Sequence, residues 1–294
     1  MFSLVARAGL AVVVGVLACG CETGGPAGGG GGRSVSGAPS AGTPWARPSV
    51  TRPRVPEGVL ASYVVFDVKR KRTLVQYRPR QVFRSASVVK ILLALDYLRE
   101  HEVSAADRAL LGVMLRSSDD KAATEFWRRG GQARVIERMV PRVGLTETAP
   151  PPADKPGFWG YTALSAEDVV RTYRYLLEKA PREHREFVLG ELRKSTKCGT
   201  DGFDQSFGIP RALEKPWAVK QGWSGFGDVP AVPCKGNVRG ASVPLGIGRP
   251  VLHTTGVVGD RIVVVLTLQP AGTSFGTASE RVTALTRQVY RAAG

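Results

Sequence analysis

Hydrophobic and polar residues alternate in some parts of this chain and recur at helical spacing in others. Residues 59–67 alternate and are rich in Val, Phe and Tyr, and with residues 73–77 they predict a β-hairpin. Between residues 85 and 101 apolar side chains recur every three or four positions, which predicts a strong helix. Shorter helices are expected over residues 105–116, 119–129 and 133–143.

The second half of the chain returns from helices to strands. A proline-rich loop over residues 150–161 precedes a helix that Ser165 caps and that runs to residue 179. We then expect a helix over 181–194, strands over 217–220, 251–258 and 261–268, and a last helix from a cap at Thr277 to residue 291. This order predicts an α+β fold, in which an antiparallel sheet built from both chain ends is flanked by helices and carries a helical subdomain.

The first 56 residues differ in composition from the rest. Residues 8–18 form an apolar run that is too short to span a bilayer, and Ala18-Cys19-Gly20-Cys21 follows. The small residues before Cys21 resemble a bacterial lipobox, so Cys21 is the expected lipid acceptor; Cys19 competes with it, and plain signal-peptidase cleavage is the alternative. We expect a signal peptide over 1–20, a Gly/Pro/Ser-rich tether over 21–56, and one exported domain over 57–294 that the lipid anchors to the outer face of the cell membrane.

The chain is strongly basic. Its 294 residues include 41 Lys and Arg against 25 Asp and Glu, a formal charge of +16. The basic residues are scattered among acids along the predicted helices, and their dense run at residues 69–72 falls on the predicted hairpin turn. This pattern favours a solvated cationic surface that faces an anionic cell envelope over a nucleic-acid site.

Two cysteines, Cys198 and Cys234, lie in the expected domain. In an exported protein an even pair predicts a disulfide, with two buried free thiols as the alternative. The cysteines and the three scattered histidines, His101, His184 and His253, show no metal-ligand spacing. We therefore expect neither a metal nor another cofactor.

Candidate chemistry begins with a serine and a lysine one helical turn apart. Ser87 and Lys90 open the predicted helix over 85–101 and face the same side, so a neutral lysine could take the serine proton. The pair alone is weak evidence, because Ser118 and Lys121 repeat the same spacing.

Three segments together carry a more specific signal. They are Ser87-Val88-Val89-Lys90 at the head of an apolar helix, Ser118-Asp119-Asp120 at the start of a later helix, and Lys220-Gln221-Gly222 at the end of a strand. Their order and setting resemble the three active-site motifs of the penicillin-recognising serine hydrolases, the class A β-lactamases and penicillin-binding proteins. The resemblance runs from about residue 58 to the C-terminus and implies a β-lactamase/transpeptidase-like fold.

The resemblance also implies residue roles. Ser87 would be the acylated nucleophile and Lys90 its general base, while Ser118 would relay a proton to the leaving nitrogen. Lys220 would stabilise charge and help to bind the substrate carboxylate. The backbone N–H groups of Ser87 and Trp223 would form the oxyanion hole, which is usually a large catalytic contribution of about 3–4 kcal/mol per donor.

The sequence departs from the family pattern at several substrate-binding and hydrolytic positions. Asp120 stands where the family has Asn, and Gln221, beside Gly222, stands where it has Ser or Thr. Class A enzymes place a Glu in an omega loop to activate the deacylating water, but residues 144–161 lack that pattern, and Glu147 and Asp154 are the candidate bases there. Without a positioned base an acyl-enzyme would persist.

The expected function is that of an exported serine hydrolase acting through acylation of Ser87 on a β-lactam or a D-alanyl peptide of peptidoglycan. The alternative is a degenerate family member that binds peptidoglycan or a partner at the envelope without turnover. A conventional Ser-His-Asp hydrolase is disfavoured, because Gly222-Trp223-Ser224-Gly225 lacks the second glycine of a nucleophile elbow.

Overall fold

The computed structural model describes residues 52–234 and 248–294. The predicted signal peptide (1–20), the acceptors Cys19 and Cys21, and the predicted tether as far as residue 51 lie outside the described residues.

The main sheet is antiparallel and has the strand order β2-β1-β7-β6-β5. Its strands are β1 (Leu60–Asp67), β2 (Arg72–Tyr77), β5 (Trp217–Ser224), β6 (Val251–Val258) and β7 (Arg261–Leu268). The sheet therefore combines strands from both ends of the chain, as the sequence predicts. The central strand, β7, is a Val/Ile/Leu run that is buried on both faces, whereas β5 lies at the edge.

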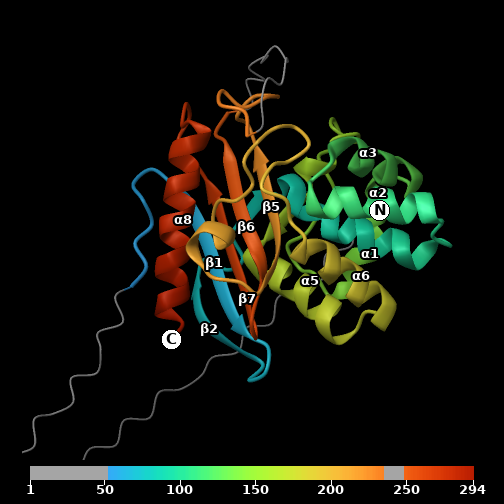
Figure 1. Cartoon of the computed structure of the whole chain (residues 1–294), viewed down its shortest axis with the longest axis horizontal. Coiled ribbons are helices and arrows are strands. Elements are labelled where there is room, and N and C mark those ends of the chain that lie inside the picture. Colours follow the sequence, from blue (N-terminus) through green and yellow to red (C-terminus); the bar gives the residue numbers. More distant parts are fainter. Residues whose placement is uncertain (1–51, 235–247) are drawn as a thin grey trace, which may run out of the picture. The chain divides into compact units, whose positions relative to one another are not determined.

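Helices lie on both sides of this sheet (Figure 1). They are α1 (Lys90–Glu100), α2 (Ala105–Arg116), α3 (Asp120–Arg129), α4 (Ala133–Val143), α5 (Ala166–Glu178), α6 (Arg182–Arg193), α7 (Ile209–Ala212) and α8 (Phe275–Ala292). Helix α8 packs on one face against β1, β6 and β7, and α5 packs on the other face against the same strands. Together these layers confirm the predicted α+β class with a helical part.

The core is divided between the two faces of the sheet. Ile262, Val264 and Leu266 of β7 point into the larger cluster with α1 and the other helices. Val263 and Val265 point into the cluster that includes the α8 side chains. This alternation follows from the two-residue period of a strand. Helix α1 lies at the centre of the larger cluster, and its residues from Lys90 to Leu98 are all buried.

The structure differs from the sequence prediction in local detail. The helix predicted over 85–101 begins with a 3-10 turn, η1 (Ala86–Val89), before α1 starts at Lys90. The strand predicted over 217–220 continues to Ser224, so its Lys-Gln-Gly motif lies inside the strand. Ser274, rather than Thr277, caps α8, because its side chain accepts the Thr277 N–H.

A small second sheet, which the sequence pattern did not predict, leads the chain into η1. It pairs β3 (Val82–Arg84) with β4 (Ala163–Ser165). Each strand has three residues, too few for a periodic pattern to show. Directly after β3 the Ser85 N–H donates to the Thr162 carbonyl at 2.8 Å, so this sheet fixes the start of the segment that carries Ser87.

Candidate active site

Ser87 lies in the short turn η1, next to a strained residue. Ala86 has φ of 45°, in the left-handed region that residues with a side chain rarely adopt. Such conformations cost on the order of 1–3 kcal/mol and persist where surrounding contacts enforce them. Only 5% of the surface of Ser87 is exposed, and this residue lines a cavity.

Lys90 is fully buried at the first turn of α1 and contacts both candidate serines. Its Nζ lies 2.9 Å from Ser87 Oγ, 2.6 Å from the Ser118 carbonyl oxygen and 3.2 Å from Ser118 Oγ. It also lies 2.5 Å from Asp120 Oδ1. Burial lowers the pKa of Lys90 from 10.5, and the charge of Asp120 partly opposes the shift. A larger fraction of this amine is therefore neutral at a given pH than of a free lysine.

Ser118 joins the first two motifs to the third. It lies between α2 and α3 with φ of 58°, a second strained position. Lys220 of β5 donates from Nζ to Ser118 Oγ at 2.9 Å. Burial, followed by the nearby charge of Lys90, holds the pKa of Lys220 well below 10.5. The three predicted segments thus meet around Ser118, from a helix start, an interhelical loop and a strand.

Gly222 allows β5 to approach the Ser87 turn closely. A Cβ atom at this position would lie 3.0 Å from the Ser85 carbonyl oxygen and 3.3 Å from the Ser87 backbone nitrogen. Distances this short leave no room for a side chain unless the strand moves. The next residue along the strand is Trp223, which lines the cavity beside Ser87.

The two substituted motif positions behave differently. Asp120 lines the cavity and forms an ion pair with Lys90, and its side chain is 60% exposed. Gln221 turns away from the cavity: its Nε2 donates to the Phe207 carbonyl at 2.5 Å and to the Gln205 carbonyl at 3.3 Å. Its Oε1 has no hydrogen-bond partner among the described residues. The geometry therefore ties Gln221 to the 205–207 segment.

The cavity that Ser87 lines has a volume of about 500 Å³. Aromatic rings dominate its wall, namely Phe158, Trp159, Tyr161, Phe203 and Trp223. Trp159, in the 3-10 turn η2 (Trp159–Tyr161), places its ring 4.6 Å from Lys90 Nζ in a cation–π contact. No motif includes Trp159, and its sequence signal, one of three aromatic residues in a proline-rich loop, is too weak to find it.

Asp201 is a further cavity residue that the sequence motifs did not indicate. It lies in the turn after Cys198, and burial, reinforced by the charge of Asp120, raises its pKa. Residues 198–203 have no periodic pattern, so only the chain path brings this carboxylate to the site.

The two candidate deacylation bases are not brought to Ser87. Glu147 pairs with Arg80 at 2.5 Å, and exposed Asp154 pairs with Lys155. Neither is among the described residues that line the cavity. Asp168 instead holds the start of this loop, because it accepts the backbone N–H groups of Thr146 and Glu147.

The rival Ser-His-Asp arrangement does not form in the described part of the chain. Ser224 Oγ contacts the Arg84 Nε at 3.4 Å. His253, fully buried in β6, accepts the Thr267 N–H at Nδ1 (3.2 Å), so Nε2 carries the proton and donates to the Arg84 carbonyl at 2.9 Å. Its role in the structure is to hold the strand that leads to Ser87.

We expect His253 to make the protein less stable in mild acid. Burial lowers its pKa from 6.5 to about 4. Between these values the unfolded chain binds a proton that the folded chain rejects, so stability falls as pH falls from 6.5 to 4, by about 3 kcal/mol in all. Urea unfolding at a series of pH values measures this slope. The His253→Asn variant should lose it, whereas exposed His101→Gln should retain it; an equal slope in all three proteins contradicts the assignment.

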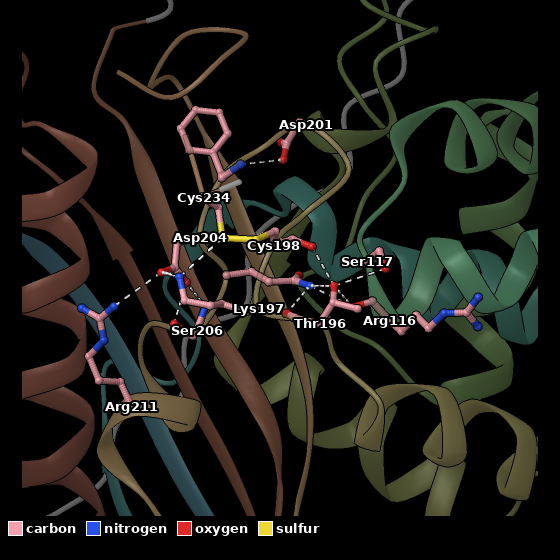
Figure 2. Close-up of a disulfide and its surroundings, with 12 residues drawn as sticks. Arg116, Ser117, Thr196, Lys197, Cys198, Asp201, Asp204, Ser206, Arg211 and Cys234 are labelled. Atoms are coloured by element: carbon pink, nitrogen blue, oxygen red, sulfur yellow. Dashed lines mark hydrogen bonds and ion pairs between the residues drawn. A yellow bond between two sulfur atoms is a disulfide. The ribbon is translucent and has the colours of Figure 1, made fainter. Parts of the chain in front are cut away.

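Cys198 and Cys234 form the disulfide that the sequence predicts, which corrects the alternative of two free thiols (Figure 2). The bond closes a loop with a sequence separation of 36, which in the chain-entropy description stabilises the fold by about 4 kcal/mol. It joins the turn that carries Asp201 to the segment after β5.

The described residues show no site for a metal and no membrane span. Within residues 52–234 and 248–294, no three His, Cys, Asp or Glu side chains gather in a way that could hold a metal ion. Over the same ranges every helix is too short or too polar to cross a bilayer.

Comparison with solved structures gives the class of the fold. A class A β-lactamase from Mycobacterium abscessus aligns with a TM-score of 0.57 and 18% identity, covering 80% of this chain and 94% of that one. A mutant of PBP-A, captured as an acyl-enzyme with penicillin G, aligns with a TM-score of 0.57 and 15% identity, covering 80% of this chain and 90% of that one. The chain thus has the fold of the class A β-lactamases and penicillin-binding proteins, as the motif order indicates.

Sequence comparison identifies the family. Proteins named as lipoproteins, LppW, in Mycobacterium bovis and in two strains of Mycobacterium tuberculosis are 35% identical to this chain over 246 residues, covering 79% of this chain and 70% of theirs. No protein-family model matches the chain. The chain belongs to the LppW family.

Proposed function

We propose that this protein forms a covalent acyl-enzyme at Ser87 with a β-lactam or a D-alanyl peptide. The observation that carries the proposal is the 2.9 Å contact between Ser87 Oγ and the buried Lys90 Nζ. A lysine whose pKa is lowered by burial is a general base for a hydroxyl nucleophile. The shared fold supports this reaction class.

The contacts support a complete proton path. Ser87 Oγ attacks the carbonyl carbon and passes its proton to neutral Lys90 Nζ. Lys90 lies 3.2 Å from Ser118 Oγ, which relays a proton to the leaving nitrogen, and the acyl–nitrogen bond breaks as the serine ester forms. Lys220 Nζ, which donates to Ser118 Oγ at 2.9 Å, stabilises the negative charge that develops on this oxygen as its proton moves to the leaving nitrogen. The oxyanion would be held by the backbone N–H groups of Ser87 and Trp223.

We also propose that the acyl-enzyme persists. Glu147 and Asp154 are not among the described residues that line the cavity, and they pair with Arg80 and Lys155 instead. The loop that carries them places the Trp159 ring over Lys90, and an indole ring offers no base for a hydrolytic water. Acylation without rapid hydrolysis is the behaviour that this geometry favours.

Incubation of the purified protein with benzylpenicillin, followed by intact-mass measurement over time, tests both proposals. We expect a mass increase equal to one whole penicillin that remains for hours. Rapid loss of the adduct with release of hydrolysed penicillin contradicts its persistence. Absence of any adduct contradicts acylation.

A second candidate function is binding of peptidoglycan peptides without turnover. Asp120 favours it, because its carboxylate, 2.5 Å from Lys90 Nζ, stabilises the protonated amine, which cannot accept a proton from Ser87. Gln221 favours it too. Its side chain is bonded to the 205–207 segment, so the cavity has no short hydroxyl at the position where the family has Ser or Thr. Failure of acylation together with measurable binding of a D-alanyl-D-alanine peptide would identify this function.

Gly222→Ala should slow acylation about tenfold and lower the stability by about 1 kcal/mol. The added methyl meets the Ser85 carbonyl and the Ser87 nitrogen, so β5 must shift by a few tenths of an ångström relative to the nucleophile. The acylation rate constant and the melting temperature measure the two effects. Gly190→Ala is the matched control: its Cβ meets nothing within 4 Å in α6, and it should leave acylation unchanged and raise stability slightly. Equal acylation by both variants contradicts the prediction.

We propose that Cys21 carries the lipid anchor, that residues 1–20 are removed as a signal peptide, and that the tether over 21–56 precedes the domain over 57–294. The names of the relatives as lipoproteins support this placement. Labelling of cells with an alkyne fatty acid should mark the wild-type protein and the Cys19→Ala variant but not Cys21→Ala. Loss of label in Cys19→Ala alone would assign the anchor to Cys19.

A further inference from the structure

The wall of the cavity next to β5 presents a carboxylate whose direction is set by two donors. Asp201 Oδ2 accepts the Trp223 Nε1–H at 2.9 Å, and its Oδ1 accepts the Phe203 backbone N–H at 3.2 Å. Trp223 lines the cavity beside Ser87. Asp201 is therefore held in one position relative to the nucleophile.

The turn that carries Asp201 is itself held in place (Figure 2). The disulfide between Cys198 and Cys234 joins it to the segment after β5. The Cys234 N–H donates to the Gly202 carbonyl at 2.9 Å, and the Gly199 N–H donates to the Phe203 carbonyl at 2.9 Å. Asp204, in the same segment, turns instead toward Lys197 and Arg211.

The residues that line the cavity carry a charge opposite to that of the whole chain. The chain carries +16, yet no Lys, Arg or His is among the described residues that line the cavity. Three aspartates line it, and of these Asp120 already has an ion-pair partner in Lys90. Asp201 is only partly exposed and makes no ion pair within 4.0 Å in the described part of the chain, although the charge of Lys90 acts on it from further away. A carboxylate shielded in part from water attracts a nearby cation more strongly than a fully solvated carboxylate does.

Aromatic rings strengthen the same preference. Phe203 and Trp223, the two residues that donate to Asp201, both line the cavity, and their ring centroids lie 6.1 Å apart. The negative faces of such rings attract ammonium groups. The part of the cavity next to Lys220, where the family binds the substrate carboxylate, also has Gln221 in place of the short hydroxyl of Ser or Thr.

We infer that Asp201 is a specificity-determining residue that makes this cavity prefer acyl donors bearing an ammonium group over those bearing an additional carboxylate. The inference rests on the proposed function, because the acyl donor must enter the cavity to reach Ser87. The net charge of the protein has the opposite effect, because it attracts anions. A preference set by Asp201 and a preference set by net charge therefore rank the acyl donors in opposite orders.

Three penicillins that share one nucleus test it. Ampicillin carries an ammonium on its side chain, benzylpenicillin carries no side-chain charge, and carbenicillin carries a second carboxylate. We expect acylation rate constants in that order, with ampicillin at least about tenfold faster than carbenicillin. Asp201→Asn keeps the shape of the side chain but removes its charge, and should bring the ratio close to one. Asp204→Asn, the matched control, should leave the ratio unchanged. A ratio of one or less in the wild type, or a ratio that Asp201→Asn does not change, overturns the inference.

Binding measurements separate this inference from the proposed function. If none of the penicillins acylates the protein, the proposed function fails, and equilibrium dialysis of the same three compounds against Ser87→Ala decides the inference alone. Tighter binding of ampicillin that is lost in the Ser87→Ala, Asp201→Asn double variant supports it. Equal binding of the three compounds, or no binding of any, overturns it.

Discussion

Replacement of Ser87 by alanine is expected to abolish covalent labelling by a fluorescent penicillin. Ser87 is the hydroxyl that lies 2.9 Å from the buried amine of Lys90 and also lines the cavity. Removal of its Oγ leaves no atom to form the ester, so the expected loss is complete rather than partial. Gel fluorescence and intact mass after incubation of the folded variant measure it, and circular dichroism checks that the variant is folded.

Ser224→Ala provides the matched control. Ser224 lines the same cavity and belongs to the segment that resembles a nucleophile elbow, but its Oγ contacts Arg84 rather than a base. Labelling should survive this change at a similar rate. Labelling that persists in Ser87→Ala and disappears in Ser224→Ala would transfer the nucleophile to Ser224.

Lys90→Met should lower the acylation rate constant about 10³-fold, the usual size of general base catalysis. Methionine fills the space of the lysine stem but cannot accept a proton. Asp120, its ion-pair partner, has a side chain that is 60% exposed, so water can solvate the carboxylate that remains. Stopped-flow or quenched mass measurements of the rate constant test the prediction.

The pH profile gives a second readout for Lys90. Burial lowers the pKa of Lys90 from 10.5. The wild-type acylation rate should therefore rise with pH as the amine becomes neutral, and it should level off at a pH lower than 10.5. Lys90→Met should show no such rise. Lys121, the exposed lysine of the second Ser-x-x-Lys pair, supplies the control, since Lys121→Met should keep both rate and profile. A flat wild-type profile contradicts a general-base role for Lys90.

Periodicity predicted most of the regular structure. The ranges of α2, α4, β6 and β7 agree with the sequence expectation. The two helices bury regularly spaced apolar side chains, and the two strands are almost wholly buried along their length. The predicted hairpin forms β1 and β2. The elements that the pattern missed, β3, β4, α7 and η2, have three or four residues each, and long-range contacts rather than an amphipathic period stabilise them.

The site was predictable only in part, for a similar reason. The motif residues Ser87, Lys90, Ser118 and Lys220 stand out because of their types, spacing and order in the sequence. In the structure each contacts the next, Ser87 with Lys90, Lys90 with Ser118 and Ser118 with Lys220. Trp159 lies in a short turn within a proline-rich loop, and Asp201 lies in a turn that a disulfide fixes. Neither segment has a periodic pattern that a sequence could reveal. Glu147 lies outside the cavity, where its backbone N–H donates to Asp168 and its side chain pairs with Arg80; both contacts join residues that are distant in the sequence.

The sequence by itself determined the class of the protein, the antiparallel sheet from both chain ends and the three segments that meet at Ser118. These features arise from local periodicity and from residue types at fixed short spacings, which any chain with this sequence displays before it folds. Only the tertiary structure decided the burial of Lys90 and Lys220, the direction of Gln221 and the negative wall of the cavity. Burial, charge pairing and close approach are sums over residues distant in sequence, so they exist only once the sheet and helices have packed.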